Sequence, residues 1–381
     1  MTDADPAIRQ RLQAALHDAV SDGVTPGAIC EVTKAGSPTI TVTAGRTASF
    51  DDSGRPLADE DRDPVTDDTI YDLASVSKIF TSITLLNLAD DGVVDLDVSV
   101  AEWLPAYESR EKSAVTLAHL LSHTSGLPPT NPHTLRRSVR GEGTDDASWV
   151  TPERSTVLDD ILTLPLARPA GTDKLYSCLG YITAMAVAEA ATGLPWEQLV
   201  RERVLEPLTL SHTTFTPDQT RTAPTEYQRH IGRGMVHGVV HDETAHALGG
   251  AAGNAGLFAP ARDVTALGSA MLAGLPGILS PQSFARLWDD QLPSRLGDAT
   301  VSVERELGYG QSLGLRIGQE SWMSPAGSNA RGHTGFTGTS ILIDRQSDLV
   351  VTLLTNRVHP HRERSDATAL RNRISAIAYE G

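Results

Sequence analysis

Residues 71–91 read YDLASVSKIFTSITLLNLADD, and this stretch determines how the rest of the chain is interpreted. It predicts a helix, because apolar residues recur at helical spacing at Ile79, Ile83 and Leu86. The helix opens on an S-x-x-K sequence that runs from Ser75 to Lys78. Lys78 is therefore expected one turn beyond Ser75, on the same face of a mostly apolar helix and inside the protein.

A serine beside a buried lysine can act as a nucleophile. Serine is unreactive until a base takes its proton, and a lysine whose charge is disfavoured by burial can serve as that base. The positive end of the helix dipole near Ser75 would stabilise negative charge on its oxygen. The same residues also fit a helix N-cap with a lysine that reaches to solvent, so the motif alone leaves both interpretations open. A second S-x-x-K, at Ser109–Lys112, has no apolar helix after it and is interpreted as a solvated surface segment.

Composition argues against several classes of protein. The chain has 381 residues, enough for a large core in one domain with an insertion or in two domains. Its net charge of −16 argues against nucleic acid and anionic membranes as partners. The two cysteines, Cys30 and Cys178, predict no disulfide framework. The sequence contains no run of about 18 apolar residues, the length that a membrane-spanning helix needs.

The first 20 residues lack the basic segment and the apolar segment of a secretory signal. Apolar residues at Ile8, Leu12, Leu16 and Val20 predict a surface helix there instead. We therefore expect a cytoplasmic protein.

The two ends of the chain resemble each other in their secondary-structure signals, and the middle differs. Each end combines a helix with β-rich segments, and the expected elements are a helix at 6–22, strands at 28–34, 39–43, 339–344 and 349–355, and a helix at 365–378. The middle is mainly helical. This pattern predicts an α/β (α+β) fold whose antiparallel sheet, flanked by helices, is built from both termini, with an inserted mainly helical domain.

We expect residues 1–95 and 325–381 to form the α/β domain and residues 96–324 the helical one. The active site is expected in the cleft between them. Residues 128–154 have no clear period and are interpreted as a long loop, a feature that is usually functional or disordered.

Two further stretches contain residues that are typical of catalytic sites. Tyr176 follows a loop. It is either a core residue whose hydroxyl is hydrogen-bonded or a residue whose phenol shuttles a proton beside Lys78. Residues 332–339 read GHTGFTGT, whose glycines permit either a plain turn before a strand or a close backbone approach to a ligand. The glycine-rich stretch 248–258, LGGAAGNAGLF, lacks the order of a nucleotide-binding loop.

Taken together, these motifs resemble those of one family. S-x-x-K at Ser75, Y-S-C at Tyr176 and H-T-G at His333 occur in the order typical of the serine β-lactamase/penicillin-binding-protein superfamily. The chain looks most like its class C branch, which also contains carboxylesterases, D-aminopeptidases and cell-wall amidases. Stretches that support the resemblance are TLAHLLSHTSGLP at 116–128 and GHTGFTGTSILID at 332–344. The resemblance implies a β-lactamase/transpeptidase-like fold.

The resemblance also implies a mechanism through an acyl-enzyme. Ser75 would attack a carbonyl, while Lys78 and Tyr176 together act as base and then as acid. The backbone N–H groups of Ser75 and Phe336 would form the oxyanion hole. No metal or cofactor is required. The residues expected to contact the substrate are Cys178, His333, Thr334, Gly335 and Arg357.

Two positions depart from the family pattern. Residue 178 is Cys where class C β-lactamases have Asn, and a thiol is only a weak hydrogen-bond donor. Residue 333 is His where β-lactamases have Lys, and an imidazole is mostly neutral at pH 7. Both departures weaken a β-lactamase interpretation.

The stretches around 240–258 and 355–362 look closest to the branch that cleaves amides between N-acetylmuramic acid and L-Ala. A basic rim at Arg357, His359 and Arg362 would suit a sugar acid or a peptide carboxylate, although such charges are usually just solvated. The sequence leaves open a small-acyl carboxylesterase, a D-aminopeptidase, a weak β-lactamase and a catalytically idle binding protein that keeps the fold.

A metallohydrolase is a further alternative. The cluster His237, His241, Asp242, Glu243 and His246 invites a metal site. It does not have the H-E-x-x-H spacing that places two zinc ligands on one helix face. The expected partner is a small-molecule amide or ester, and the sequence does not determine the oligomeric state.

Overall fold

The computed structural model describes residues 6–130, 153–229 and 232–381, without the side chains of 299–301. Its main feature is a seven-stranded sheet in the order β2-β1-β11-β10-β9-β8-β7, in which every paired strand is antiparallel. The strands are Gly27–Lys34 (β1), Ile40–Gly45 (β2), Gly310–Gln311 (β7), Arg316–Ile317 (β8), Arg331–Thr334 (β9), Ser340–Asp344 (β10) and Leu349–Thr355 (β11).

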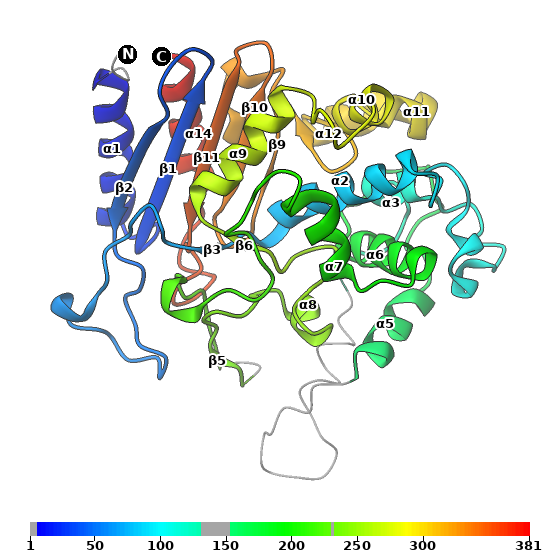
Figure 1. The fold of residues 1–381 in the computed structure, drawn as a ribbon, viewed down its shortest axis with the longest axis horizontal. Helices are drawn as coiled ribbons and strands as arrows, with labels where there is room; N and C mark the ends of the chain where they lie inside the picture. The colour runs from blue at the N-terminus through cyan, green and yellow to red at the C-terminus, as the bar shows by residue number, and fades with distance from the viewer. Residues whose placement is uncertain (1–5, 131–152, 230–231) are drawn as a thin grey trace, which may run out of the picture.

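Helices cover both faces of the sheet because apolar residues alternate along its strands. In β1, Ala28, Cys30 and Val32 face the core formed with α1 (Pro6–Ser21) and α14 (Thr368–Tyr379). The intervening Ile29 belongs to the larger core on the opposite face, where α9 (Ala261–Leu272) packs on β1, β10 and β11. Figure 1 shows α1 and α14 side by side at one end of the molecule, with both chain termini there.

The rest of the large core lies in a helical region built around α2 (Ser77–Asp90), whose side chains are almost all buried. The antiparallel sheet, built mainly from both termini, and this helical region together confirm the predicted α/β (α+β) fold. The helices that contact α2 are α6 (Cys178–Thr192), α7 (Trp196–Val200), the π-helical turn η5 (Arg201–Leu205) and α10 (Pro281–Trp288). Other elements are β3 (Tyr71–Asp72), α3 (Leu117–Leu121), α5 (Arg154–Thr163), β4 (Tyr227–Gln228), β5 (Gly234–Met235), α8 (Glu243–Ala247), β6 (Phe258–Ala259), α11 (Leu292–Leu296), α12 (Thr300–Leu307) and α13 (Glu320–Met323).

The domain boundaries at 95 and 325 stay a prediction, but two parts of the range 96–324 belong to the sheet layer. Strands β7 and β8 extend the sheet edge, and α9 packs on its face. Of the predicted loop 128–154, residues 131–152 lie outside the described residues.

The surface interpretation of the second S-x-x-K is wrong for its lysine. Lys112 is 4% exposed, and its Nζ donates to the backbone oxygen of Leu162 at 2.7 Å. The Lys112 ammonium also lies 4.8 Å from the centre of the Tyr107 ring. The apolar stem of the lysine is buried because its charged end finds a carbonyl and an aromatic ring inside the protein.

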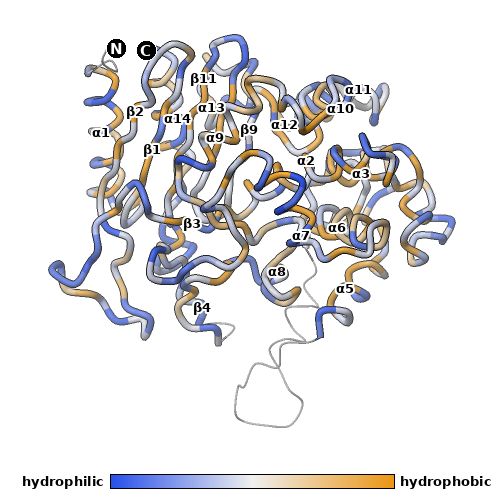
Figure 2. The backbone as a smooth tube through the Cα atoms, viewed as in Figure 1, coloured by the Kyte–Doolittle hydropathy of each residue, from blue (hydrophilic) through white to orange (hydrophobic). Residues whose placement is uncertain are grey.

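Hydrophobic residues lie along the sheet and inside the helical region, and hydrophilic residues dominate the outlying loop after β2 (Figure 2). Within the described part of the chain, no helix combines the length and the apolar character needed to cross a bilayer.

Close packing of α9 on the sheet gives a test of this fold. A Cβ added at Gly268 would lie 2.6 Å from Val350 Cγ1 and 3.1 Å from Ile341 Cδ1. We expect Gly268→Ala to lower the unfolding free energy by about 1–2 kcal/mol, because overpacking outweighs the gain in helix propensity. Urea denaturation measures the change, with the exposed Ala266→Ser in the same helix as a control within about 0.5 kcal/mol of wild type. An unfolding free energy at or above the wild-type value would contradict the tight α9–sheet contact.

Candidate active site

Ser75 lies in a short 3₁₀ turn, η2 (Ala74–Val76), directly before α2 and not on the first α-helical turn. The preceding Ala74 has φ +47°, in the left-handed region that is costly for a residue with a Cβ. Two side chains fix this turn: Asp72 Oδ1 accepts from the Ala74 N–H at 2.8 Å, and Thr339 Oγ1 donates to the Leu73 carbonyl at 3.0 Å. Ser75 is thereby held half-buried where the sheet meets the helical region.

Lys78 is fully buried, as its apolar helix predicts. Its Nζ donates to Ser75 Oγ at 2.9 Å and to the backbone oxygen of Asn254 at 2.9 Å. A longer contact of 3.6 Å joins Nζ to Cys178 Sγ. The three donors of the ammonium therefore point to three separate segments of the chain.

The Lys78 ammonium is retained in spite of its burial. Burial acts to lower the pKa of Lys78, but the Cys178 thiol and the Tyr176 phenol beside it leave that pKa above its ordinary value. Lys78 therefore carries a proton at neutral pH.

Tyr176 completes the contacts of Ser75. Its hydroxyl is hydrogen-bonded to Ser75 Oγ at 2.9 Å, and its ring centre lies 5.2 Å from Lys78 Nζ. The ring packs against the buried imidazole of His123, with 4.4 Å between centroids. His123 Nδ1 accepts from the Ser177 N–H at 3.2 Å, so this histidine holds the tyrosine segment from the side. Burial, aided by the charges of Lys174 and Lys78, lowers the pKa of His123 well below its usual value, which keeps the imidazole neutral.

The H-T-G residues lie on and just after β9, beside this group. His333 is 1% exposed, with its ring centre 6.1 Å from that of Tyr176. Burial, followed by the charges of Arg316 and Lys78, lowers the pKa of His333 well below its usual value, so it carries no charge at pH 7. Gly335 approaches η2 closely, since a Cβ there would lie 2.5 Å from the Leu73 oxygen and 3.3 Å from Ala74 Cβ.

The three residues of the expected basic rim, Arg357, His359 and Arg362, all have hydrogen-bond or ionic partners within the protein. Arg357 donates to the backbone oxygens of Phe336, Arg362 and Ser365. Arg362 forms ion pairs with the carboxylates of Glu226 and Glu243. His359 is buried, and its Nε2 accepts from the backbone N–H groups of Ser49 and Phe50. A substrate role for Arg357 stays a prediction.

Sequence reasoning missed Arg316, whose guanidinium lies 5.5 Å from the Tyr176 ring centre. Its Nη1 lies 3.0 Å from Gln319 Oε1 and 3.5 Å from Thr334 Oγ1. Its Nε is buried without a hydrogen-bond partner, and no carboxylate of the described residues forms an ion pair with it. Arg316 lies in a stretch without any clear pattern, so no signal in the sequence distinguishes it.

Lys174, two residues before Tyr176, adds a second cation. It is 7% exposed, and its Nζ lies 2.9 Å from the Tyr309 hydroxyl. The Arg316 guanidinium lies 5.6 Å from the centre of the same Tyr309 ring. Burial and the charge of Arg316 lower the pKa of Lys174 to about 7, partly opposed by Asp290. Lys174 is one of only four lysines in the chain, a rarity that could have drawn attention to it.

Two histidines of the metal alternative have other partners. His241 Nε2 contacts Glu226 Oε2 at 2.9 Å, and His237 Nδ1 contacts Asp52 Oδ1 at 3.1 Å. Asp242 Oδ1 accepts from the Ala245 N–H as the N-cap of α8. Within the described ranges, no three His, Cys, Asp or Glu side chains are grouped so that they could hold a metal ion.

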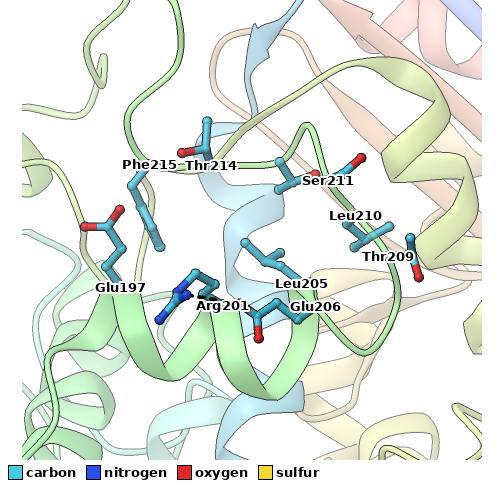
Figure 3. A pocket seen from close by; sticks show the side chains of 10 residues that line it. Glu197, Arg201, Leu205, Glu206, Thr209, Leu210, Ser211, Thr214 and Phe215 are labelled. Atoms are coloured by element: carbon cyan, nitrogen blue, oxygen red, sulfur yellow. Dashed lines mark hydrogen bonds and ion pairs between the residues drawn. The ribbon is translucent and has the colours of Figure 1, made fainter.

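A separate pocket of about 420 Å³ lies beside α7 and η5 (Figure 3). Leu205, Leu210 and Phe215 form its apolar part, and Arg201 at its edge is ion-paired to Glu206 at 3.0 Å. None of the predicted site residues lines it. The group around Ser75 is therefore the candidate active site.

Solved structures of similar fold include three hydrolases or related proteins. EstCE1, described as a hydrolase with promiscuous acyltransferase activity, aligns with a TM-score of 0.74 and 22% identity over 98% of this chain and 99% of that one. The D-amino acid amidase from Ochrobactrum anthropi SV3 has a TM-score of 0.70 and 19% identity over 97% and 98%. A penicillin-binding protein homologue from Pyrococcus abyssi has a TM-score of 0.72 and 18% identity over 97% and 76%. These likenesses show a shared fold.

Sequence comparison extends this result. A Salmonella typhimurium protein with the provisional name D-alanyl-D-alanine carboxypeptidase is 28% identical over 322 residues, which cover 77% of this chain and 71% of that protein. The sequence model of the Beta-lactamase family matches residues 8–375, nearly the whole chain. The chain therefore belongs to the Beta-lactamase family, and it has the fold of the serine β-lactamase and penicillin-binding-protein hydrolases.

Proposed function

We propose that this protein is a serine amidase that acts through an acyl-enzyme on Ser75, and that its substrate is a cell-wall fragment of the muramoyl-L-alanine type. The observation that carries the proposal is the double contact of Ser75 Oγ, 2.9 Å from Lys78 Nζ and 2.9 Å from the Tyr176 hydroxyl. A serine oxygen held between an ammonium and a phenol is equipped for nucleophilic attack.

In the acylation step, Ser75 Oγ forms a bond to the substrate carbonyl carbon while its proton passes to the Tyr176 oxygen and the phenol's own proton moves toward the leaving nitrogen. The Lys78 ammonium beside the ring stabilises the negative charge that develops on the Tyr176 oxygen during this transfer. Tyr176 completes the transfer of its own proton to the leaving nitrogen as the C–N bond breaks. Water repeats the sequence on the acyl-enzyme and releases the acid, with Tyr176 and Lys78 again moving the proton.

The oxyanion hole of this mechanism consists of the backbone N–H groups of Ser75 and Phe336. Neither N–H has a backbone acceptor among the described residues, so both are available to a developing oxyanion. The close packing of Gly335 against Leu73 and Ala74 supports their juxtaposition, because it brings the segment before Phe336 onto the turn before Ser75.

The cations beside Tyr176 indicate a substrate that carries a carboxylate. Arg316 has no ionic partner among the described residues, it lies next to Thr334 Oγ1, and Lys174 shares the Tyr309 ring with it. A guanidinium with a neighbouring hydroxyl is well suited to bind a carboxylate. The L-Ala-D-Glu dipeptide released from a muramoyl peptide has carboxylates on its leaving side, and the Salmonella relative is likewise named for peptides that end in a carboxylate.

A small-acyl carboxylesterase is the second candidate. The uncharged His333 favours it, because an ester without a carboxylate needs no fixed cation at that position. The similarity of fold to EstCE1 is compatible with this alternative.

The first test is mass spectrometry of N-acetylmuramoyl-L-Ala-D-Glu after incubation with the protein. We expect free N-acetylmuramic acid and L-Ala-D-Glu with the wild type, and intact substrate with Ser75→Ala, since the variant has no nucleophile. Release by Ser75→Ala would exclude catalysis by this serine. Intact substrate with wild type would reject the muramoyl substrate and make the esterase the leading candidate, with short p-nitrophenyl esters as the next assay.

Arg316 gives a test of the substrate class. We expect Arg316→Met to raise KM about 10- to 100-fold for the carboxylate substrate, because a charged hydrogen bond is lost. Its KM for neutral p-nitrophenyl acetate should stay at the wild-type value. A pH profile of the wild type gives a second measurement. KM for the carboxylate substrate should increase when the pH is raised above about 7, because Lys174 loses its positive charge there. Equal effects of Arg316→Met on both substrates would contradict carboxylate recognition.

Gly335 gives a test of the oxyanion hole. A Cβ at this position would lie 2.1 Å from Thr339 Oγ1 and 2.5 Å from the Leu73 oxygen, so Gly335→Ala must push Phe336 away from Ser75. We expect kcat for p-nitrophenyl acetate to fall about 10²- to 10³-fold, the usual effect of losing one oxyanion donor. Circular dichroism checks that the variant is folded. A folded variant with wild-type kcat would rule out this donor.

A further inference from the structure

A buried carboxamide beside Lys78 has no part in the mechanism above. Asn254 is 0% exposed, and its backbone oxygen accepts the hydrogen bond from Lys78 Nζ. In contrast, neither Oδ1 nor Nδ2 of its side chain has a hydrogen-bond partner among the described residues. Both ends of this amide are therefore unsatisfied inside the protein.

Such an arrangement is unfavourable for folding. A buried donor or acceptor without a partner loses its hydrogen bonds to water and gains nothing in return. Native proteins satisfy nearly all such groups, and the exceptions call for a reason other than stability. A leucine, which has nearly the same shape, would fill the space of Asn254 without this penalty.

The side chain of Asn254 lies near Cys178, the residue that gives Lys78 its longest contact. Burial raises the pKa of the Cys178 thiol, and the Asn254 amide is among the groups that oppose this shift, although no hydrogen bond of standard geometry joins the two side chains. Of the three donors on Lys78, the one directed at Cys178 has the poorest acceptor, a thiol sulfur at 3.6 Å. No carboxylate of the described residues forms an ion pair with Lys78, and its other neighbours include the rings of Tyr176 and Tyr181.

During acylation the best side-chain acceptor of Lys78 changes. Ser75 Oγ accepts from Lys78 at rest. Once this oxygen bonds to the substrate carbonyl, it becomes an ester oxygen and a weaker acceptor. The ammonium then needs a replacement acceptor within the same buried space.

We propose that Asn254 is a positioning residue for this step: its Oδ1 accepts a hydrogen bond from the Lys78 ammonium as Ser75 Oγ bonds to the substrate. The carboxamide thus supplies the strong acceptor that the thiol of Cys178 does not. This inference rests on acylation of Ser75, the core of the proposed function, but not on the identity of the natural substrate.

The test uses the full chain and p-nitrophenyl acetate, which reports acylation of Ser75 whatever the natural substrate is. We expect Asn254→Leu to lower kcat about 10- to 100-fold, as for loss of a hydrogen bond to a charged group, with little change in KM. The urea midpoint of the same variant should equal or exceed that of the wild type, because an unsatisfied amide has been removed. If the leucine variant does not fold, Asn254→Ala replaces it in the kinetic comparison.

A rescue experiment separates this role from a packing role. Cys178 Sγ lies 3.6 Å from Lys78 Nζ, so a carboxamide introduced by Cys178→Asn can reach the ammonium. We expect Cys178→Asn to restore kcat of the Asn254→Leu variant at least about tenfold. The matched control, Cys178→Ala in the same background, should restore nothing, since it removes the thiol without adding an acceptor.

The outcomes distinguish this inference from the proposed function. An active wild type whose kcat is unchanged by Asn254→Leu overturns the inference alone. A folded Asn254→Leu variant with low kcat that Cys178→Asn fails to improve also overturns it. A wild type whose Ser75 reacts with neither the ester nor a fluorophosphonate overturns the proposed function and the inference together.

Discussion

Burial of the Lys78 ammonium is the constraint on which the site depends. A charge inside a protein is tolerated only when hydrogen-bond acceptors surround it. For Lys78 these acceptors come from the turn before α2, the start of α6 and the loop at 254, the last of which lies 176 residues beyond Lys78 in sequence. Ser75 belongs to the first of these segments, and Tyr176, two residues before the second, also contacts it. Satisfying the lysine therefore also holds together the residues of the candidate active site.

A strained turn sets the position of Ser75 relative to the sheet. Ala74 adopts a left-handed conformation that a residue with a Cβ avoids unless its surroundings enforce it. Two threonines from the β9–β10 loop provide that enforcement, because Thr337 donates to the Asp72 carbonyl and Thr339 to the Leu73 carbonyl. The turn that carries Ser75 is thus fixed by the strand loop that carries the Phe336 N–H. Sheet and helical region are joined at the turn that precedes Ser75.

The local charge of the site is opposite to that of the whole protein. The chain has a net charge of −16, yet Lys78, Lys174 and Arg316 gather around Tyr176, where His123 and His333 are neutral. The histidines are uncharged because burial and the nearby cations both oppose their protonation. Position 333 carries no fixed cation, and the guanidinium near it is that of Arg316, which comes from the neighbouring strand β8.

The sequence by itself determined the features that repeat locally. Helical spacing identified α2 and the burial of Lys78, β-rich apolar segments identified the main strands, and the order of Ser75, Tyr176 and His333 identified the family. Only the tertiary structure decided which polar and charged side chains have partners within the protein and which of them reach the site. Arg357 has three backbone acceptors, Lys112 is buried against Leu162, and Arg316 comes to the site from a segment without a local signal. Asn254 lies in the glycine-rich stretch 248–258, whose pattern does not predict its contact with Lys78. The reason is physical: periodicity reports the environment of a face, whereas the partner of a single polar group depends on segments that meet only in the folded chain.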